Sequence, residues 1–220
     1  MPVFITAEGI DGTGKSSVLS EVVRRLKAEG HEMVLTKEPT DTWAGQAVRR
    51  GISEKVSPYT EALLFTADRT LHVQDIKKWL AEGRNVISDR YFDSTIAYQA
   101  ARLEEVAGGD KRASLKAVRW LDGLNRPFVL VPDRTLLFRA PPALCLRRVD
   151  SSRTDRSDFE REAFLGRVQH FYGLLAKKER RRFVPIDAEQ PFDAVTTRVE
   201  QVVRDTLEKG SRVGKRIRSR

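Results

Sequence analysis

The sequence predicts an α/β fold, in which a five-stranded parallel β-sheet carries helices on both faces. First, short β-rich segments alternate with longer segments of helical apolar spacing along the whole chain. Second, the β-rich segment 3–7 leads directly into the loop Gly9-Ile10-Asp11-Gly12-Thr13-Gly14-Lys15-Ser16, and helical spacing follows it. A strand, a glycine-rich loop and a helix in this order are typical of sheets that bind phosphate groups at a helix N-terminus.

The first half of the chain contains three expected strands. The helix after the first strand ends at Gly30, because glycine favours the left-handed conformation that closes helices. The second strand covers Glu32–Thr36. The third, Asn85–Ser88, follows the helix-closing Gly83 and is apolar at its centre, as a strand buried on both faces should be. Helices are expected over about 15–29, 42–51 and 58–82.

The second half continues the alternation with strands at Arg134–Phe138 and Arg182–Ile186. We find no repeat, linker or domain boundary, so residues 1–208 are expected to form one domain. Residues 209–220 are basic and are expected to be a disordered tail. Helices are expected over about 94–106, 111–123, 142–149, 159–179 and 192–208.

Composition bounds the class of protein. The chain has 220 residues, of which 40% are hydrophobic and 32% are charged, as expected for a globular domain with one core. The single Cys145 excludes an internal disulfide and suits a reducing compartment. The chain begins almost at once with a strand, which leaves no room for a signal peptide, and no apolar run is long enough to span a membrane. These features predict a cytoplasmic protein without a membrane partner.

The net charge of +9 raises the question of nucleic-acid binding. Residues 209–220 hold six basic residues and no acidic one, so the rest of the chain carries only +3. That remaining excess suits a protein that handles two phosphorylated substrates. The charge distribution therefore argues against a nucleic-acid partner.

The glycine-rich loop is a complete phosphate-binding motif, G-x-x-x-x-G-K-S. Backbone N–H groups of such a loop surround the phosphates, the lysine reaches the β- and γ-phosphates, and the serine binds Mg²⁺. The sequence thus predicts a nucleoside triphosphate site, and the loop residues that would form it are Gly9, Asp11, Gly12, Thr13, Gly14, Lys15, Ser16 and Ser17.

Charged residues also follow the second and third expected strands, at Lys37-Glu38-Pro39-Thr40 and at Asp89-Arg90-Tyr91. Ligands of parallel sheets bind beyond the carboxyl ends of the strands, where these residues would meet the loop. Carboxylates there can hold Mg²⁺ and cations can hold a second phosphorylated molecule. Any one of these charges alone would be read as a surface salt bridge.

Two further segments are candidates. Phe65 and Arg69 share one face of the expected 58–82 helix, so a ring could stack on a nucleobase while a guanidinium reaches its carbonyl. In isolation, a core phenylalanine with a solvated arginine would be the simpler interpretation. Residues 147–158 contain four arginines and three aspartates. A mobile lid over about 150–160 that brings arginine to a transferring phosphoryl group is one interpretation, and a charged connector is the other.

Taken together, the ordered motifs resemble thymidylate kinase, a nucleotide kinase of the P-loop type that converts dTMP and ATP to dTDP and ADP. The resemblance covers nearly the whole chain outside the basic tail. The motifs that carry it are AEGIDGTGKS at 7–16, KEPT at 37–40, LLFTADR at 63–69, SDRYFDSTIAYQ at 88–99, DRSDFE ending at residue 160 and IDAEQ at 186–190.

The resemblance implies a role for each matching residue. Arg90 would bridge the acceptor and donor phosphates beside the P-loop Lys15, with Ser16 and Asp89 on the Mg²⁺ side. Arg148 would lie against adenine near Ala188. A homodimer is also implied. The residues expected to contact dTMP are Asp11, Lys37, Glu38, Pro39, Phe65, Arg69, Arg90, Thr95, Tyr98 and Gln99.

The phosphate-binding loop indicates a subtype. Some members of the family have an arginine in this loop where the chain has Thr13, and members without it carry the catalytic arginine on the lid. Arg153 and Arg156 are therefore the expected catalytic arginines of the lid. Two residues depart from the family pattern: Lys37 replaces an arginine and loses its bidentate fork, and Arg139 stands where an aspartate is common.

Two alternatives remain. A deoxynucleoside kinase would use Glu38 as a general base on a sugar hydroxyl, and residues 37–43 resemble that family. A phosphate acceptor needs no such base, because it is largely dianionic at neutral pH. A more distant alternative is a nucleotide-driven switch that binds nucleic acid through the tail. It leaves the motifs after the second and third strands unexplained.

Overall fold

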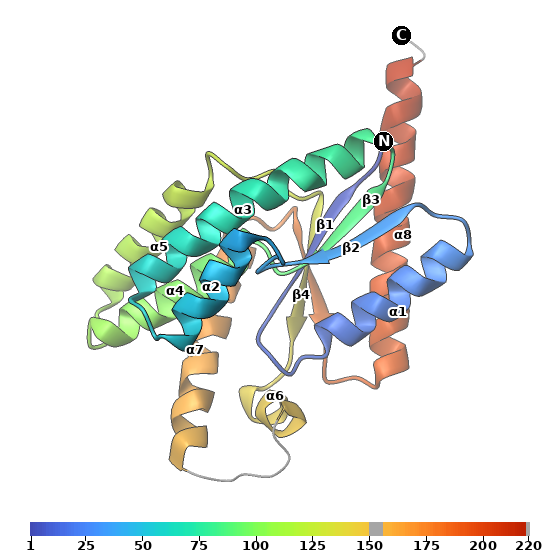
Figure 1. Ribbon diagram of the computed structural model, residues 1–220. Coiled ribbons are helices and arrows are strands. Elements are labelled where there is room, and N and C mark those ends of the chain that lie inside the picture. The colour runs from blue at the N-terminus through green and yellow to red at the C-terminus, as the bar shows by residue number, and fades with distance from the viewer. Residues whose placement is uncertain (150–155, 219–220) are drawn as a thin grey trace.

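A computed structural model describes residues 1–149 and 156–218, together with their side chains except those of 111, 156–159 and 211–218. Within these residues the chain forms one parallel sheet of five strands, as the sequence predicts, and the strands lie in the order β2-β3-β1-β4-β5 (Figure 1). The strands are β1 (Phe4–Glu8), β2 (Met33–Lys37), β3 (Asn85–Asp89), β4 (Arg134–Arg139) and β5 (Phe183–Asp187).

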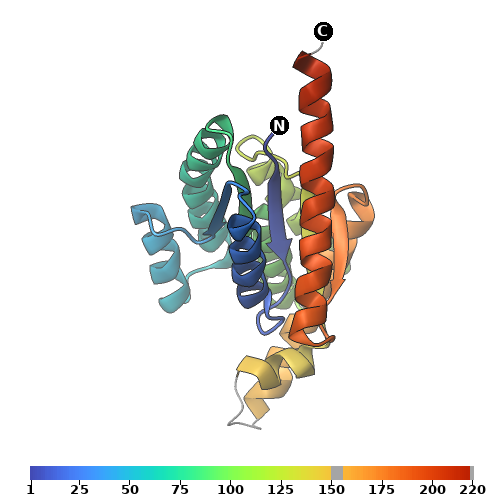
Figure 2. The same cartoon turned by 90° about the vertical axis from the view of Figure 1, so that its right-hand side faces the viewer.

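Helices cover both faces of the sheet. Contacts place α1 and α8 together on one face, and α3, α4, α5 and α7 pack with one another on the other (Figures 1 and 2). The helices are α1 (Lys15–Ala28), α2 (Trp43–Ser53), α3 (Pro58–Ala81), α4 (Phe92–Val106), α5 (Lys111–Asn125), α6 (Pro142–Val149), α7 (Arg156–Lys178) and α8 (Phe192–Arg218). None of the helices within the described residues has the length and apolarity needed to cross a bilayer.

The central position of β1 determines where the chemistry lies. Every residue of β1 is buried, and the strand pairs with β3 on one side and β4 on the other. The phosphate-binding loop therefore leaves the middle of the sheet at its carboxyl edge, beside the ends of both neighbouring strands.

Side-chain caps begin two of the helices. Thr42 accepts a hydrogen bond from the Gly45 amide at the start of α2, and Ser57 accepts one from the Thr60 amide at the start of α3.

The last helix is longer than the sequence predicts. We expected it to end near Glu208 and to be followed by a disordered tail, whereas in the structure residues 209–218 continue α8. Lysine and arginine are good helix formers, and the terminal ammonium of Met1 donates to the Gly210 carbonyl at 2.6 Å. Figure 2 shows the final turns of α8 extending beyond the end of the sheet.

Two glycines of left-handed conformation permit a test of close packing. Gly12 has φ +82°, and a Cβ there would lie 2.2 Å from the carbonyl oxygen of Cys145 in α6. Gly30 has φ +87° with no atom within 4 Å of the corresponding position. At both positions a residue with a side chain meets a similar backbone penalty. Only at Gly12 would the added Cβ also collide with another part of the chain.

We therefore expect Gly30→Ala to lower the free energy of unfolding by about 1 to 2 kcal/mol, and Gly12→Ala to lower it by at least about 2 kcal/mol more. Urea unfolding of both variants measures the difference. Equal losses would mean that α6 moves freely away from the loop.

Candidate functional site

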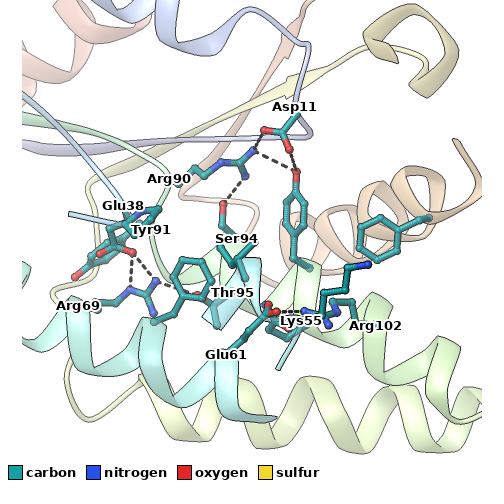
Figure 3. Close-up of a pocket in the computed structure, with 16 residues that line it drawn as sticks. Asp11, Glu38, Lys55, Glu61, Arg69, Arg90, Tyr91, Ser94, Thr95 and Arg102 are labelled. Carbon is teal, nitrogen blue, oxygen red and sulfur yellow. Dashed lines mark hydrogen bonds and ion pairs between the residues drawn. The ribbon is translucent and has the colours of Figure 1, made fainter. Parts of the chain in front are cut away.

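A cavity of about 490 Å³ opens at the carboxyl edge of the sheet, next to the phosphate-binding loop. Figure 3 shows Asp11 and Arg90 at one end and Glu61 with Arg102 at the other. Ten of its lining residues are candidates named from the sequence: Asp11, Glu38, Pro39, Phe65, Arg69, Arg90, Tyr91, Thr95, Tyr98 and Gln99. The others are Ile52, Lys55, Glu61, Ser94, Arg102 and Phe164.

Lys15 begins α1 and turns back over the loop. Its ammonium donates to the Gly9 and Ile10 carbonyls, each at 3.1 Å, and to the Thr13 hydroxyl at 3.4 Å. Burial first, and the nearby charge of Arg90 second, lower the pKa of Lys15 to about 8. A cation held only by neutral oxygens is well prepared to receive an anion.

Ser16 and Asp89 meet as expected, because the start of α1 faces the end of β3. The Ser16 hydroxyl donates to Asp89 Oδ2. The other oxygen, Asp89 Oδ1, is buried and has no hydrogen-bond partner among the described residues. Hydroxyl and carboxylate oxygens are the ligands that Mg²⁺ prefers, so this pair fits that ion. No group of three acidic, histidine or cysteine side chains suited to a metal occurs in the described part of the chain.

Arg90 connects the loop with the cavity. Its Nη1 donates to the Ser94 hydroxyl at 3.0 Å, and its Nη2 donates to Asp11 Oδ1 at 2.6 Å and to the Tyr98 hydroxyl at 3.2 Å. Its guanidinium lies 5.0 Å from the Tyr98 ring centroid. The backbone of Arg90 has φ +70°, a costly conformation outside glycine that occurs at functional sites.

Charge interactions fix the ionisation of this pair. Burial opposes the charge of Asp11, yet Arg90 and Lys15 together hold the pKa of its carboxyl below the usual range. Burial opposes the charge of Arg90, yet Tyr98 and Tyr172, and after them Asp11 and Glu8, raise the pKa of Arg90 well above its ordinary value. Asp11 and Arg90 are both charged at neutral pH, so a cation stays between the phosphate-binding loop and the cavity.

Arg69 is not the solvated arginine of the simpler interpretation. It is 1% exposed and forms an ion pair with Glu38, at 2.5 Å from Nη2 and 3.0 Å from Nε. The second carboxylate oxygen of Glu38 contacts His72 Nδ1 at 3.0 Å. Arg69 also donates to Asn125 and to Thr95, at 2.5 and 3.0 Å. Because these four hydrogen bonds fix the guanidinium plane of Arg69, its remaining N–H can point in only one direction.

Phe65 lines the cavity together with Thr95, Gln99 and Arg69. Thr95 and Gln99 come from α4 and are 2% exposed. Helical spacing brings Thr95, Tyr98 and Gln99 to one side of α4 (Phe92–Val106), which starts two residues earlier than expected. This part of the cavity therefore combines one aromatic face with buried polar groups.

Some expected site residues are not brought to the cavity. Lys37 ends β2, is exposed and is not among the lining residues. Arg148 donates to the Ala188 carbonyl at 2.8 Å, so these two residues do meet, as expected. Arg153 lies outside the described residues, as does most of the lid, and the structure describes only the backbone of Arg156.

Sequence reasoning missed Glu8, the last residue of β1. It is fully buried, and its carboxyl accepts from the Tyr91 amide at 2.9 Å, the Ser94 hydroxyl at 2.5 Å and the Tyr172 hydroxyl at 2.9 Å. Burial first, and then the negative charge of Asp93, raise the pKa of Glu8 to about 8. The Ser94 hydroxyl also accepts a hydrogen bond from Arg90. The hydrogen bonds around Glu8 therefore help to hold Arg90 in place. A charged residue directly after the mostly apolar segment 3–7 was the available signal.

This raised pKa predicts a pH dependence of stability. Between about pH 4.5 and pH 8 the folded protein keeps the Glu8 proton and the unfolded chain releases it. Stability from this group therefore falls as pH rises, by up to about 1.4 kcal/mol per pH unit. The amide introduced by Glu8→Gln cannot ionise. Relative to that variant, we expect wild-type stability to fall by about 3 kcal/mol between about pH 5.5 and pH 8.

Urea unfolding at several pH values measures this difference, since groups that do not interact with Glu8 titrate alike in both proteins. The exposed Glu54→Gln is the control, and its profile should parallel that of the wild type. Parallel profiles for Glu8→Gln as well would show that Glu8 has an ordinary pKa.

Comparison with known proteins places this site in context. A family model described as thymidylate kinase matches residues 7–199. A probable thymidylate kinase from Methanoculleus marisnigri is 41% identical over 194 residues, covering 88% of this chain and 90% of that protein. Another from Methanococcoides burtonii is 36% identical over 208 residues (93% and 98%). A thymidylate kinase from Bifidobacterium longum is 35% identical over 211 residues (92% and 98%).

Proposed function

The chain belongs to the thymidylate kinase family, and we propose that it transfers the γ-phosphoryl group of ATP to dTMP at this site. The observation that carries the proposal is the position of Arg90, between the phosphate-binding loop and a cavity of nucleotide size. Phosphoryl transfer mainly requires positioning and neutralisation of charge, and a guanidinium between two phosphate groups supplies both.

The cavity suits the acceptor nucleotide. Phe65 offers a ring for the thymine to stack on, and the remaining N–H of Arg69 would bond its O4. Thr95 and Gln99 border the base, while Asp11 and Tyr98 lie at the sugar end beside Arg90. Glu38 and Pro39 form the adjoining wall. Lys37 is exposed and does not line this cavity, so its contact with the acceptor phosphate stays a prediction.

The loop suits the donor. Lys15 would meet the β- and γ-phosphates, with loop backbone groups from Gly9 to Ser17 around them. Mg²⁺ would be held by Ser16 and Asp89, whose unpartnered oxygen supports this assignment, and the bound ion would offset phosphate charge. Arg148 and Ala188 would border adenine. Arg153 and Arg156 stay the proposed lid arginines.

The alternative use of Glu38 as a general base fits the structure poorly. One carboxylate oxygen accepts from Arg69 and the other contacts His72, and the side chain is 1% exposed. A base for a sugar hydroxyl needs an oxygen within reach of that proton. Glu38 instead orients Arg69, the residue proposed to read the base.

Coupled ADP release with Mg·ATP tests the proposal, with dTMP and thymidine as acceptors. We expect turnover with dTMP and none with thymidine. Turnover with thymidine alone would return Glu38 to the role of base and overturn the proposal.

A homodimer is part of the proposal. Tyr59 and Leu63 on α3 are more than half exposed, and Trp120 on α5 stacks edge-on against Tyr59 with ring centroids 5.2 Å apart. Neighbouring exposed apolar side chains of this kind mark interaction surfaces. Sedimentation equilibrium of wild type and Leu63→Glu tests whether this surface joins two copies. Cytoplasmic localisation stays a prediction from the sequence.

A further inference from the structure

The end of the cavity away from Arg90 contains a buried carboxylate that the roles above do not use. Glu61, on α3, accepts a hydrogen bond from Gln99 Nε2 through Oε2 at 3.0 Å. Its other oxygen, Oε1, accepts from Arg102 Nη1 on α4. Glu61 and Gln99 are 4% and 2% exposed, so water hardly competes for these bonds. Figure 3 shows Glu61 and Arg102 together at this end.

Glu61 decides which end of the Gln99 amide faces the cavity. A carboxylate paired with a guanidinium only accepts hydrogen bonds, so it holds the amide nitrogen of Gln99 toward itself. The amide oxygen, Oε1, then points the other way, is buried and has no hydrogen-bond partner among the described residues. Because an unpaired buried acceptor is costly, this oxygen needs a donor from a ligand in the cavity that Gln99 lines.

Arg69 offers the cavity a hydrogen-bond donor, where Gln99 offers an acceptor. Four hydrogen bonds to protein acceptors within the described residues, two to Glu38 and one each to Asn125 and Thr95, use four of its five N–H groups. One N–H on Nη1 is left for a ligand. The cavity thus presents one fixed acceptor, on Gln99, and one fixed donor, on Arg69.

We propose that Glu61 is a positioning residue that sets the pyrimidine specificity of the acceptor site. A base that donates from N3 and accepts at position 4, as thymine and uracil do, matches the acceptor of Gln99 and the donor of Arg69. Cytosine accepts at N3 and donates from its amino group at position 4. It would therefore leave both the Gln99 oxygen and the Arg69 N–H without a partner. The inference rests on the proposed function, because it places the acceptor base in this cavity.

Arg102 makes Glu61→Gln a reversal of this pattern rather than a simple loss. Arg102 can only donate, so it holds the new amide oxygen at position 61, and the new amide nitrogen faces Gln99. Gln99 then turns its oxygen toward that nitrogen and its own NH₂ group toward the cavity. An amide donor in this place suits N3 of cytosine.

The test is kcat/KM for dTMP and for dCMP at saturating Mg·ATP. We expect Glu61→Gln to lower the ratio of dTMP to dCMP at least about tenfold, with dCMP use rising in absolute terms. Glu61→Asp keeps an acceptor-only carboxylate and should keep a higher ratio than Glu61→Gln. Glu54→Gln removes the same charge from an exposed ion pair and should leave the ratio unchanged. Nucleotide binding without ATP, measured by calorimetry, should show the same change in preference.

Each outcome separates the inference from the function on which it rests. A wild type that does not phosphorylate dTMP overturns the proposed function. A wild type that does, with an unchanged ratio in folded Glu61→Gln, overturns this inference alone. An equal loss of both activities in Glu61→Gln and Glu61→Asp would mean a merely structural role and would also overturn it. Should Glu61→Gln not fold, Glu61→Leu is the second variant, because leucine lets the Gln99 amide take either orientation. An unchanged ratio of dTMP to dCMP in Glu61→Leu would also overturn the inference.

Discussion

Lys15→Met is expected to lower kcat/KM with Mg·ATP by about a thousandfold, the largest loss from any single change on the donor side. Methionine keeps most of the volume of the buried side chain and removes only the ammonium. That ammonium now rests on the Gly9 and Ile10 carbonyls, where it can turn to the β- and γ-phosphates. Steady-state kinetics and ATP binding measure the loss.

Lys37→Met is the matched control, because Lys37 is exposed and does not line the cavity. We expect an effect of less than about tenfold on kcat/KM, in KM for dTMP rather than in ATP affinity. A drop in ATP affinity as large as that of Lys15→Met would mean that the loop lysine is not the main cation for the donor.

The lowered pKa of Lys15 has a consequence for wild-type enzyme. Free Lys15 loses its proton near pH 8, and a bound triphosphate favours the charged form. Binding above pH 8 therefore requires uptake of a proton, so ATP affinity should fall by up to about tenfold per pH unit there. The dependence should vanish in Lys15→Met, and its persistence would assign it to another group.

The donor side could be predicted from sequence because its determinants are local. Eight consecutive residues set the backbone of the loop, and Lys15 and Ser16 begin the helix that follows. The ends of strands β2 and β3 were predictable to within one residue, since charged residues follow their apolar segments, and each strand continues one residue further than expected, to Lys37 and to Asp89. Parallel pairing then places Lys37 beside Asp89 without further information.

The acceptor side could be predicted only in part, because its contacts join distant segments. Glu61 lies 38 residues before Gln99, and Arg69 lies 56 residues before Asn125. No periodicity in the sequence indicates which carboxylate will face which amide. Burial makes these pairs important, since each polar group withdrawn from water must find its partner inside the protein.

Arg90→Lys is expected to lower kcat with dTMP by about 100- to 1000-fold and to change stability by less than about 1 kcal/mol. Arg90 donates from two nitrogens, to Ser94 on one side and to Asp11 on the other, so its plane is fixed between the two proposed phosphate sites. Lysine keeps the charge but is a single point donor and cannot make both bonds in this geometry. Both residues bear the same backbone penalty at φ +70°, so stability is a fair comparison.

The decisive comparison for Arg90 is between kcat and KM. A group that bridges the phosphates in the transition state should affect kcat more than KM, whereas one that only binds dTMP should raise KM alone. Arg24→Lys, in an exposed pair with Glu21 on α1, controls for the chemical change and should behave as wild type. A folded Arg90→Lys with kcat within about threefold of wild type would reduce Arg90 to an orienting partner of Asp11, and the transferring group would then need its cation from the lid.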